Sequence, residues 1–148
     1  MIDLDPFRNL VPLDHGLSVV VTRRPDHTPH TSVVNAGVLH SPLDNTESVA
    51  FVAAGRTRKL TNLRSDPTIS IVARVGWRWA TVEGTATLIG PDDPDPGINS
   101  EQLRLLLRDI FTAAGGTHDN WDTYDQTMRD EHRTAVLITP SRTYTSPT

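Results

Sequence analysis

The sequence contains no cysteine, and it has no long uninterrupted apolar run. The absence of cysteine excludes disulfide bonds, thiolate chemistry and metal sites built on thiolates. The N-terminal residues show neither the basic start nor the apolar core of a signal peptide, and no stretch has the length to cross a bilayer. We therefore expect a soluble, cytoplasmic protein that has no membrane partner.

The chain also lacks an excess of positive charge, since its formal net charge is -4. Mild acidity without a broad basic face is not typical of nucleic-acid-binding proteins. A length of 148 residues fits one domain that can bury a core without cross-links. We expect a single cofactor-binding domain over residues 1–148.

Common catalytic motifs are absent as well. The six histidines form no His-Glu-x-x-His pattern, no serine lies in Gly-x-Ser-x-Gly, and neither a dinucleotide-binding glycine motif nor a P-loop is present. His27 and His30 share a turn, but a surface role is favoured for them over metal binding. No catalytic side chain and no metal ligand is assigned. This pattern fits a protein whose chemistry comes from a bound cofactor.

A basic segment, residues 55–67, lies between two apolar runs and predicts a strand, a turn, a short helix and a second strand. Arg56, Arg58 and Lys59 lie at the start of this helix, where free backbone N–H groups and the helix dipole favour an anion. A solvated surface turn is the alternative. Because the chain as a whole is acidic, this local positive charge favours a phosphate site.

Within that short helix, Leu60 and Leu63 are spaced for the inward face. Arg58 and Asn62 lie one turn apart on another face. Further along, Trp77 and Trp79 are two residues apart, so in a strand both point to the same side. By itself such a pair belongs to the core of a sheet more often than to a cofactor contact.

The apolar and β-branched runs predict an antiparallel barrel. We expect strands at residues 17–22, 30–39, 48–54, 68–74, 77–89 and 134–139, the last of them ending at Pro140. We expect a short helix after the basic turn, and a short helix or loop at residues 2–13. A third helix is capped by Asn99 and Gln102 and ends at Gly115-Gly116, and residues 120–130 form a further helix. The fold class is mainly β, a closed antiparallel barrel with three or four short flanking helices.

Several motifs resemble the pyridoxamine 5'-phosphate oxidase-like split β-barrel proteins. They are Thr57-Arg58-Lys59, the following Asn62-Leu-Arg-Ser-Asp-Pro67, and Trp79-x-x-Val-Glu-Gly84. Residues 25–35 and 118–124 match as well. Within that superfamily the chain looks like the coenzyme F420-dependent branch, the B-type flavin/deazaflavin oxidoreductases.

The resemblance implies roles for particular residues. Arg58 and Lys59 pair with the cofactor phosphate, while Thr57 and Asn62 add neutral hydrogen bonds. Arg133 reaches the anionic tail or a partner subunit. The implied cofactor-binding set is Thr31, Ser32, Val34, Asn35, Arg56, Thr57, Arg58, Lys59, Asn62, Trp77, Trp79 and Arg133, of which Thr31, Ser32, Val34 and Asn35 line the ring.

The resemblance also implies a function. It indicates an oxidoreductase, a reductase that transfers a hydride from reduced coenzyme F420 to an unsaturated small molecule, in a homodimer whose cofactor groove lies between the subunits. The alternatives are an FMN-dependent oxidoreductase of the same fold, and a non-catalytic protein that binds a flavin, haem or tetrapyrrole. The substrate is not indicated.

Overall fold

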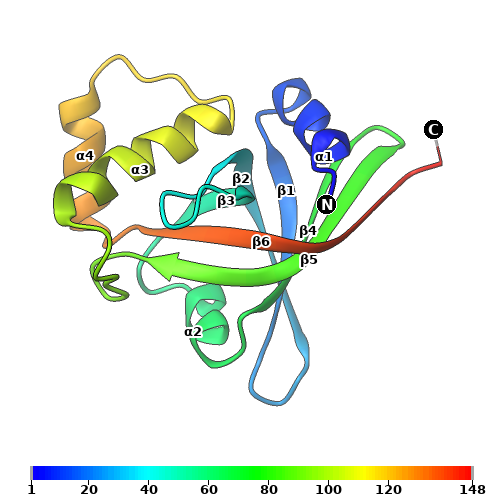
Figure 1. Cartoon of the computed structure of the whole chain (residues 1–148), viewed down its shortest axis with the longest axis horizontal. Helices are drawn as coiled ribbons and strands as arrows, with labels where there is room; N and C mark the ends of the chain where they lie inside the picture. The colour runs from blue at the N-terminus through cyan, green and yellow to red at the C-terminus, as the bar shows by residue number, and fades with distance from the viewer. Residues whose placement is uncertain (1, 148) are drawn as a thin grey trace.

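Six antiparallel strands close into a barrel in the order β1-β2-β3-β6-β5-β4 (Figure 1). The computed structural model describes residues 2–147. The strands are β1 (Leu17–Arg23), β2 (Pro29–His40), β3 (Glu47–Ala53), β4 (Thr68–Val75), β5 (Arg78–Ile89) and β6 (Thr134–Thr145). The helices are α1 (Asp5–Leu10), the 3-10 helix η1 (Val11–Leu13), α2 (Arg58–Ser65), α3 (Ser100–Ala113) and α4 (Trp121–Asp130). The predicted fold class is confirmed.

The barrel encloses one hydrophobic core. Alternate residues of the strands point inward, among them Val20 and Phe51, and both are fully buried. In Figure 1, α1 lies at the upper end of the barrel and α2 at the lower end. Phe7 of α1 and Leu60 of α2 belong to the same interior cluster. The two short helices therefore close the barrel with apolar side chains.

A second core lies outside the barrel, where α3 packs on β2, β3 and β6 and α4 contributes Tyr124 to the same cluster. Leu106 and Ile110 of α3 and Tyr124 of α4 cover Leu137 of β6. Helix α3 begins at the predicted capping box, in which Asn99 and Gln102 exchange side-chain and backbone hydrogen bonds of 2.8 Å. None of the helices within residues 2–147 combines the length and apolar character required to cross a bilayer.

Most predicted strand boundaries differ from the observed ones by one residue, and the errors at Trp77 and Pro140 change the environment of a named residue. Trp77 lies in the β4–β5 turn after Gly76, whose φ is +61°, so β5 begins one residue later and Trp77 does not share a strand face with Trp79. Strand β6 continues through Pro140 to Thr145. Proline is tolerated there because it lies opposite Gly84, where the β5–β6 register shifts.

Gly37 brings α3 into direct contact with β2. A Cβ atom on this residue would lie 2.4 Å from the carbonyl carbon of Ala113 at the end of α3. Only a residue without a side chain allows that approach. Gly37 thus marks a close backbone approach between β2 and α3.

Substitution of Gly37 tests this contact. We expect Gly37→Ala to lower the free energy of unfolding by about 1–3 kcal/mol, because α3 must move away from the sheet. Urea denaturation measures the change. Gly97→Ala is the matched control, since its Cβ would approach no atom closer than 3.2 Å, the end of the Asp95 side chain. Equal stability of the two variants would contradict close packing at Gly37.

Candidate functional site

Three cations gather where α2 begins. Arg56 and Arg58 are exposed and Lys59 is partly buried. Within residues 2–147, no carboxylate forms an ion pair with any of the three. By contrast, Arg64 near the other end of the helix binds both carboxylate oxygens of Asp93 at 2.8 and 2.9 Å. The cations at the start of α2 are therefore free to bind an external anion.

Arg133, the residue before β6, lies near this cluster and is itself paired with Glu131. The register places Ala53 opposite Thr134, and the backbone N–H of Gly55 donates to the carbonyl oxygen of Glu131 at 3.0 Å. Burial lowers the pKa of Lys59, and the positive charge of Arg133 lowers it further. Both effects disfavour the protonated amine. A bound anion beside Lys59 reverses them, which fits a site shaped for negative charge.

Asn62 is buried, in contrast to its expected place on the outer face with Arg58. Only 1% of the residue is exposed, because this side of α2 rests on β1. Its Nδ2 donates to Oγ1 of Thr22 at 3.1 Å, and its Oδ1 has no hydrogen-bond partner among the described residues. A buried amide oxygen without a partner is uncommon in folded proteins. Asn62 thus brings an unused acceptor beneath the cationic cluster.

Strand β2 divides the predicted ring-binding residues between its two faces. Ser32 and Val34 point toward the barrel interior, whereas Thr31 and Asn35 are exposed on the outer face. Adjacent residues of a strand point to opposite faces, so these four side chains cannot all lie on one side. The Oγ atom of Ser32 is buried and has no partner within the described chain. Ser32 therefore lies on the same inward face as the orphaned groups near α2, while Asn35 faces a different space.

That space is a cavity of about 440 Å³ between the outer face of the barrel and the helices α3 and α4. Asn35 and Val52 form its barrel side, and Phe111, Tyr124 and Met128 form its helical side. Arg133 also lines the cavity. Because the positive charge of Arg133 is felt by Lys59, this one residue connects the cavity to the cationic cluster.

Tyr124 is a fixed part of the cavity wall. Its hydroxyl donates to the carbonyl oxygen of Leu107 at 2.9 Å, and its ring packs at 5.1 Å from the ring of Phe111. Burial raises the pKa of Tyr124 to about 12. The phenol therefore stays protonated near neutral pH and supplies a flat, apolar surface.

The structure does not bring the two predicted tryptophans to this site. Trp77 is 95% exposed in its turn. Trp79 lines a separate groove of about 310 Å³ with Val19 and Val33, and its ring meets that of Tyr144 at 6.1 Å. Thr57 is engaged locally, since its hydroxyl donates to the carbonyl oxygen of Ala54 at 3.0 Å.

Sequence reasoning also missed residues that belong here. Phe111 and Tyr124, which are not in the predicted site set, line the cavity. His30 was interpreted as a surface residue, yet its Nδ1 is buried without a partner within residues 2–147. The period of two in β2 is the signal that finds His30, because it lies two residues from Ser32 on the inward face.

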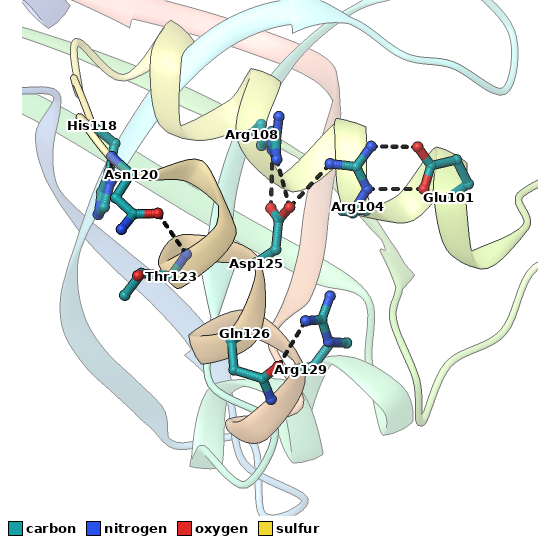
Figure 2. A network of polar contacts seen from close by, with 9 residues as sticks. All are labelled: Glu101, Arg104, Arg108, His118, Asn120, Thr123, Asp125, Gln126 and Arg129. Atoms are coloured by element: carbon teal, nitrogen blue, oxygen red, sulfur yellow. Dashed lines mark hydrogen bonds and ion pairs between the residues drawn. The ribbon is translucent and has the colours of Figure 1, made fainter.

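The helical wall of the cavity is held by an ion-pair network between α3 and α4 (Figure 2). The side chain of Asp125 is only 7% exposed and accepts hydrogen bonds from Arg108 at 2.5 and 2.9 Å and from Arg104 at 3.0 Å. Arg104 also pairs with Glu101, and Arg108 lies 5.1 Å from the ring centroid of Trp121. These contacts fix α4, and with it Tyr124, against α3.

We expect Asp125→Asn to lower the free energy of unfolding by about 1–2 kcal/mol, because its hydrogen bonds lose their charge. Hydrogen bonds from Arg108 and then Arg104 lower the pKa of Asp125. A carboxyl group whose pKa is lower in the folded than in the unfolded state stabilises the fold at pH values above its unfolded-state pKa. That stabilisation is lost as the pH falls through the folded-state pKa. The difference from wild type should therefore shrink in acid. Urea denaturation at neutral and acidic pH measures it, with exposed Asp109→Asn as the control.

Comparison with known proteins places this geometry in context. A family model described as "Pyridoxamine 5'-phosphate oxidase" matches residues 7–146. The conserved hypothetical protein Rv2991 from Mycobacterium tuberculosis is a similar solved structure, with 19% identity, coverage of 98% of this chain and 84% of that one, and a TM-score of 0.69.

Two other solved structures have cofactors in their names. One is an F420 reductase, with 17% identity, coverage of 93% and 94%, and a TM-score of 0.59. The other is a pyridoxamine 5'-phosphate oxidase-related, FMN binding protein from Nostoc punctiforme, with 17% identity, coverage of 96% and 78%, and a TM-score of 0.60. At these identities the likeness concerns the fold.

Proposed function

We propose that this chain, which belongs to the pyridoxamine 5'-phosphate oxidase family, is an oxidoreductase that binds coenzyme F420 and reduces an unsaturated small molecule. One observation carries the proposal. Arg56, Arg58 and Lys59, which have no carboxylate partner in the described chain, lie near a cavity large enough for a flat ring system, and Arg133, itself paired with Glu131, lines that cavity and acts on Lys59. A cofactor that joins a ring to a phosphate matches this pair of features.

Each part of the site has a role in holding such a cofactor. Arg58 offers a planar fork and Lys59 a point charge to the phosphate. Asn35 and Val52 lie where a ring in the cavity meets the barrel, with Tyr124 and Phe111 on the opposite side. The deazaflavin, when bound, supplies the hydride. The side chains of this chain bind, orient and exclude water, consistent with the absence of an acid, base and nucleophile set in the sequence.

FMN is the second candidate cofactor. It also carries a phosphate on a ribityl chain, so the cationic cluster suits it equally, and a solved structure of the same fold is described as FMN binding. The motifs shared with the F420-dependent branch favour the deazaflavin. A protein that binds either cofactor without turnover corresponds to the third, non-catalytic reading.

Titration with both cofactors tests the proposal. We expect coenzyme F420 to bind in the micromolar range or tighter, and FMN more weakly, as followed by fluorescence. Lys59→Ala and Arg58→Ala should each weaken binding by about 1.5–3 kcal/mol, the value of a hydrogen bond to a charged group. Oxidation of reduced F420 in the presence of conjugated acceptors then separates catalysis from binding.

Arg64→Ala is the matched control for these variants. It removes a cation from the same helix, but one that is paired with Asp93. Its affinity for F420 should equal that of the wild type, although its stability falls. Wild-type affinity in folded Lys59→Ala protein would show that the anion site is assigned wrongly. A preference for FMN would move the chain to the flavin-dependent branch.

We propose also that the working unit is a homodimer. Val33, Val19 and Val72 lie opposite one another across β2, β1 and β4 and form an apolar row on the outer face of the barrel. Val33 is 63% exposed and Val19 is 39% exposed. Contiguous exposed apolar surface of this kind is typical of an interface.

The position of this row supports a second copy as its occupant. Val33 lines the apolar groove and Asn35, two residues along the same face of β2, lines the cavity. Likewise, Asp14 lines the groove and the adjacent His15 lines the cavity. A subunit placed on the groove thus borders the cavity, and two-fold symmetry produces two equivalent sites. The exposed Tyr144 lies beside Trp79 and is available to the partner.

Light scattering tests the dimer. We expect a particle of twice the 16.3 kDa chain mass for the wild type. Val33→Asp should shift it to the monomer, because a charge in the apolar row cannot be desolvated without cost. Leu105→Asp is the control, since Leu105 is 44% exposed on α3 and lies outside the groove. A monomeric wild type with full cofactor affinity would overturn the shared site.

A further inference from the structure

His30 has a position that the cofactor assignment does not explain. It lies on the inward face of β2, opposite Thr22 of β1, and Thr22 in turn accepts the hydrogen bond from Asn62. Nδ1 of His30, Oγ of Ser32 and Oδ1 of Asn62 are all buried, and none has a hydrogen-bond partner within residues 2–147. The Ser32 hydroxyl and a protonated His30 ring can donate to a ligand at this β1–β2–α2 junction, whereas Asn62 Oδ1 can only accept.

The charges around His30 indicate what that ligand is. Arg24 faces it from the β1–β2 hairpin, and Arg58 and Lys59 face it from α2. Within the described part of the chain, no carboxylate is among the groups that act on it. Arg24 is held in place because its Nη1 donates to the carbonyl oxygen of Pro29 at 2.6 Å. Cations on two elements and no anion fit a ligand of negative charge.

We propose that His30 is a further ligand of the cofactor phosphate and binds it in the protonated, imidazolium form. This inference rests on the proposed function and adds that the protein takes up a proton when the cofactor binds. A neutral Nδ1 that carries a lone pair repels an anion, whereas a protonated Nδ1 donates a charge-assisted hydrogen bond. Ser32 Oγ, on the same face of the strand, supplies a neutral donor beside it.

Proton uptake follows from the surroundings of His30. In the free protein, burial and then the charges of Arg24, Lys59 and Arg58 lower the pKa of His30 below its ordinary value, so the ring is neutral near pH 7. A bound phosphate favours the charged ring and raises that pKa. Cofactor affinity is therefore highest at low pH and decreases as the pH rises through the pKa of the complex.

Calorimetry with coenzyme F420 tests this directly, because its phosphodiester does not titrate near neutrality. Titrations in buffers of different ionisation enthalpy at constant pH measure the number of protons taken up. We expect a fraction of a proton for the wild type, and a fall in affinity of about tenfold between about pH 6 and pH 8. The F420 chromophore without its phosphate should bind with no uptake.

His30→Asn and His27→Asn form a matched pair in one hairpin. Asparagine keeps a neutral polar group near the position of Nδ1 but cannot be protonated. We expect His30→Asn to take up no proton and to bind F420 about tenfold more weakly at pH 6, with little change at pH 8. The exposed His27 should tolerate the same change at either pH. His30→Gln replaces His30→Asn if circular dichroism shows that the latter does not fold.

The outcomes separate the two proposals. Wild-type binding of F420 without proton uptake, or unchanged uptake in the folded His30 variant, overturns the role of His30 and leaves the cofactor assignment intact. Failure to bind both F420 and FMN overturns the cofactor assignment and this inference with it. If FMN alone binds, the same titrations apply, and the proton released by its phosphate monoester is measured in the His30 variant.

Discussion

Strand β6 pairs with β3 along one edge and with β5 along the other, and the site depends on this pairing. It places Ala53 opposite Thr134, so the turn that leads into α2 lies beside the residues that precede β6. The hydrogen bond from Gly55 to the carbonyl oxygen of Glu131 fixes that contact. Arg133 and Lys59 consequently lie close enough for the charge of one to lower the pKa of the other. Barrel closure thus assembles the cationic cluster from segments far apart in the sequence.

Repulsion within this cluster supports the proposal that it binds an anion. The chain carries a formal net charge of -4, yet the ion pairs of the described residues leave Arg56, Arg58 and Lys59 without a carboxylate. Burial of Lys59 adds a desolvation cost to the repulsion. The folded chain therefore holds positive charge that no carboxylate of the described residues neutralises, and the unpartnered Nδ1 of His30 lies near it.

Much of the fold could be predicted from local patterns. The succession of strands along the chain follows from the periodicity of apolar residues. The capping box at Asn99 and the helix end at Gly115 follow from backbone chemistry that acts over a few residues. Trp77 and Pro140 are the instructive errors. Whether Trp77 is in a strand or in a turn, and whether a strand passes through Pro140, depends on the register of the neighbouring strand, which sequence spacing does not reveal.

By itself the sequence determined that a basic turn with Arg56, Arg58 and Lys59 precedes a short helix, because helix-end chemistry is local; the anion site proposed there starts from that pattern. Only the tertiary structure decided which other residues belong to it. Asn62 points inward because α2 packs on β1, and the predicted residues of β2 lie on two faces of the strand. Phe111 and Tyr124 form the cavity wall because Asp125 holds α4 on α3. Those outcomes depend on contacts between distant segments, whose energies are set by packing and burial and are invisible to the spacing of residues along the chain.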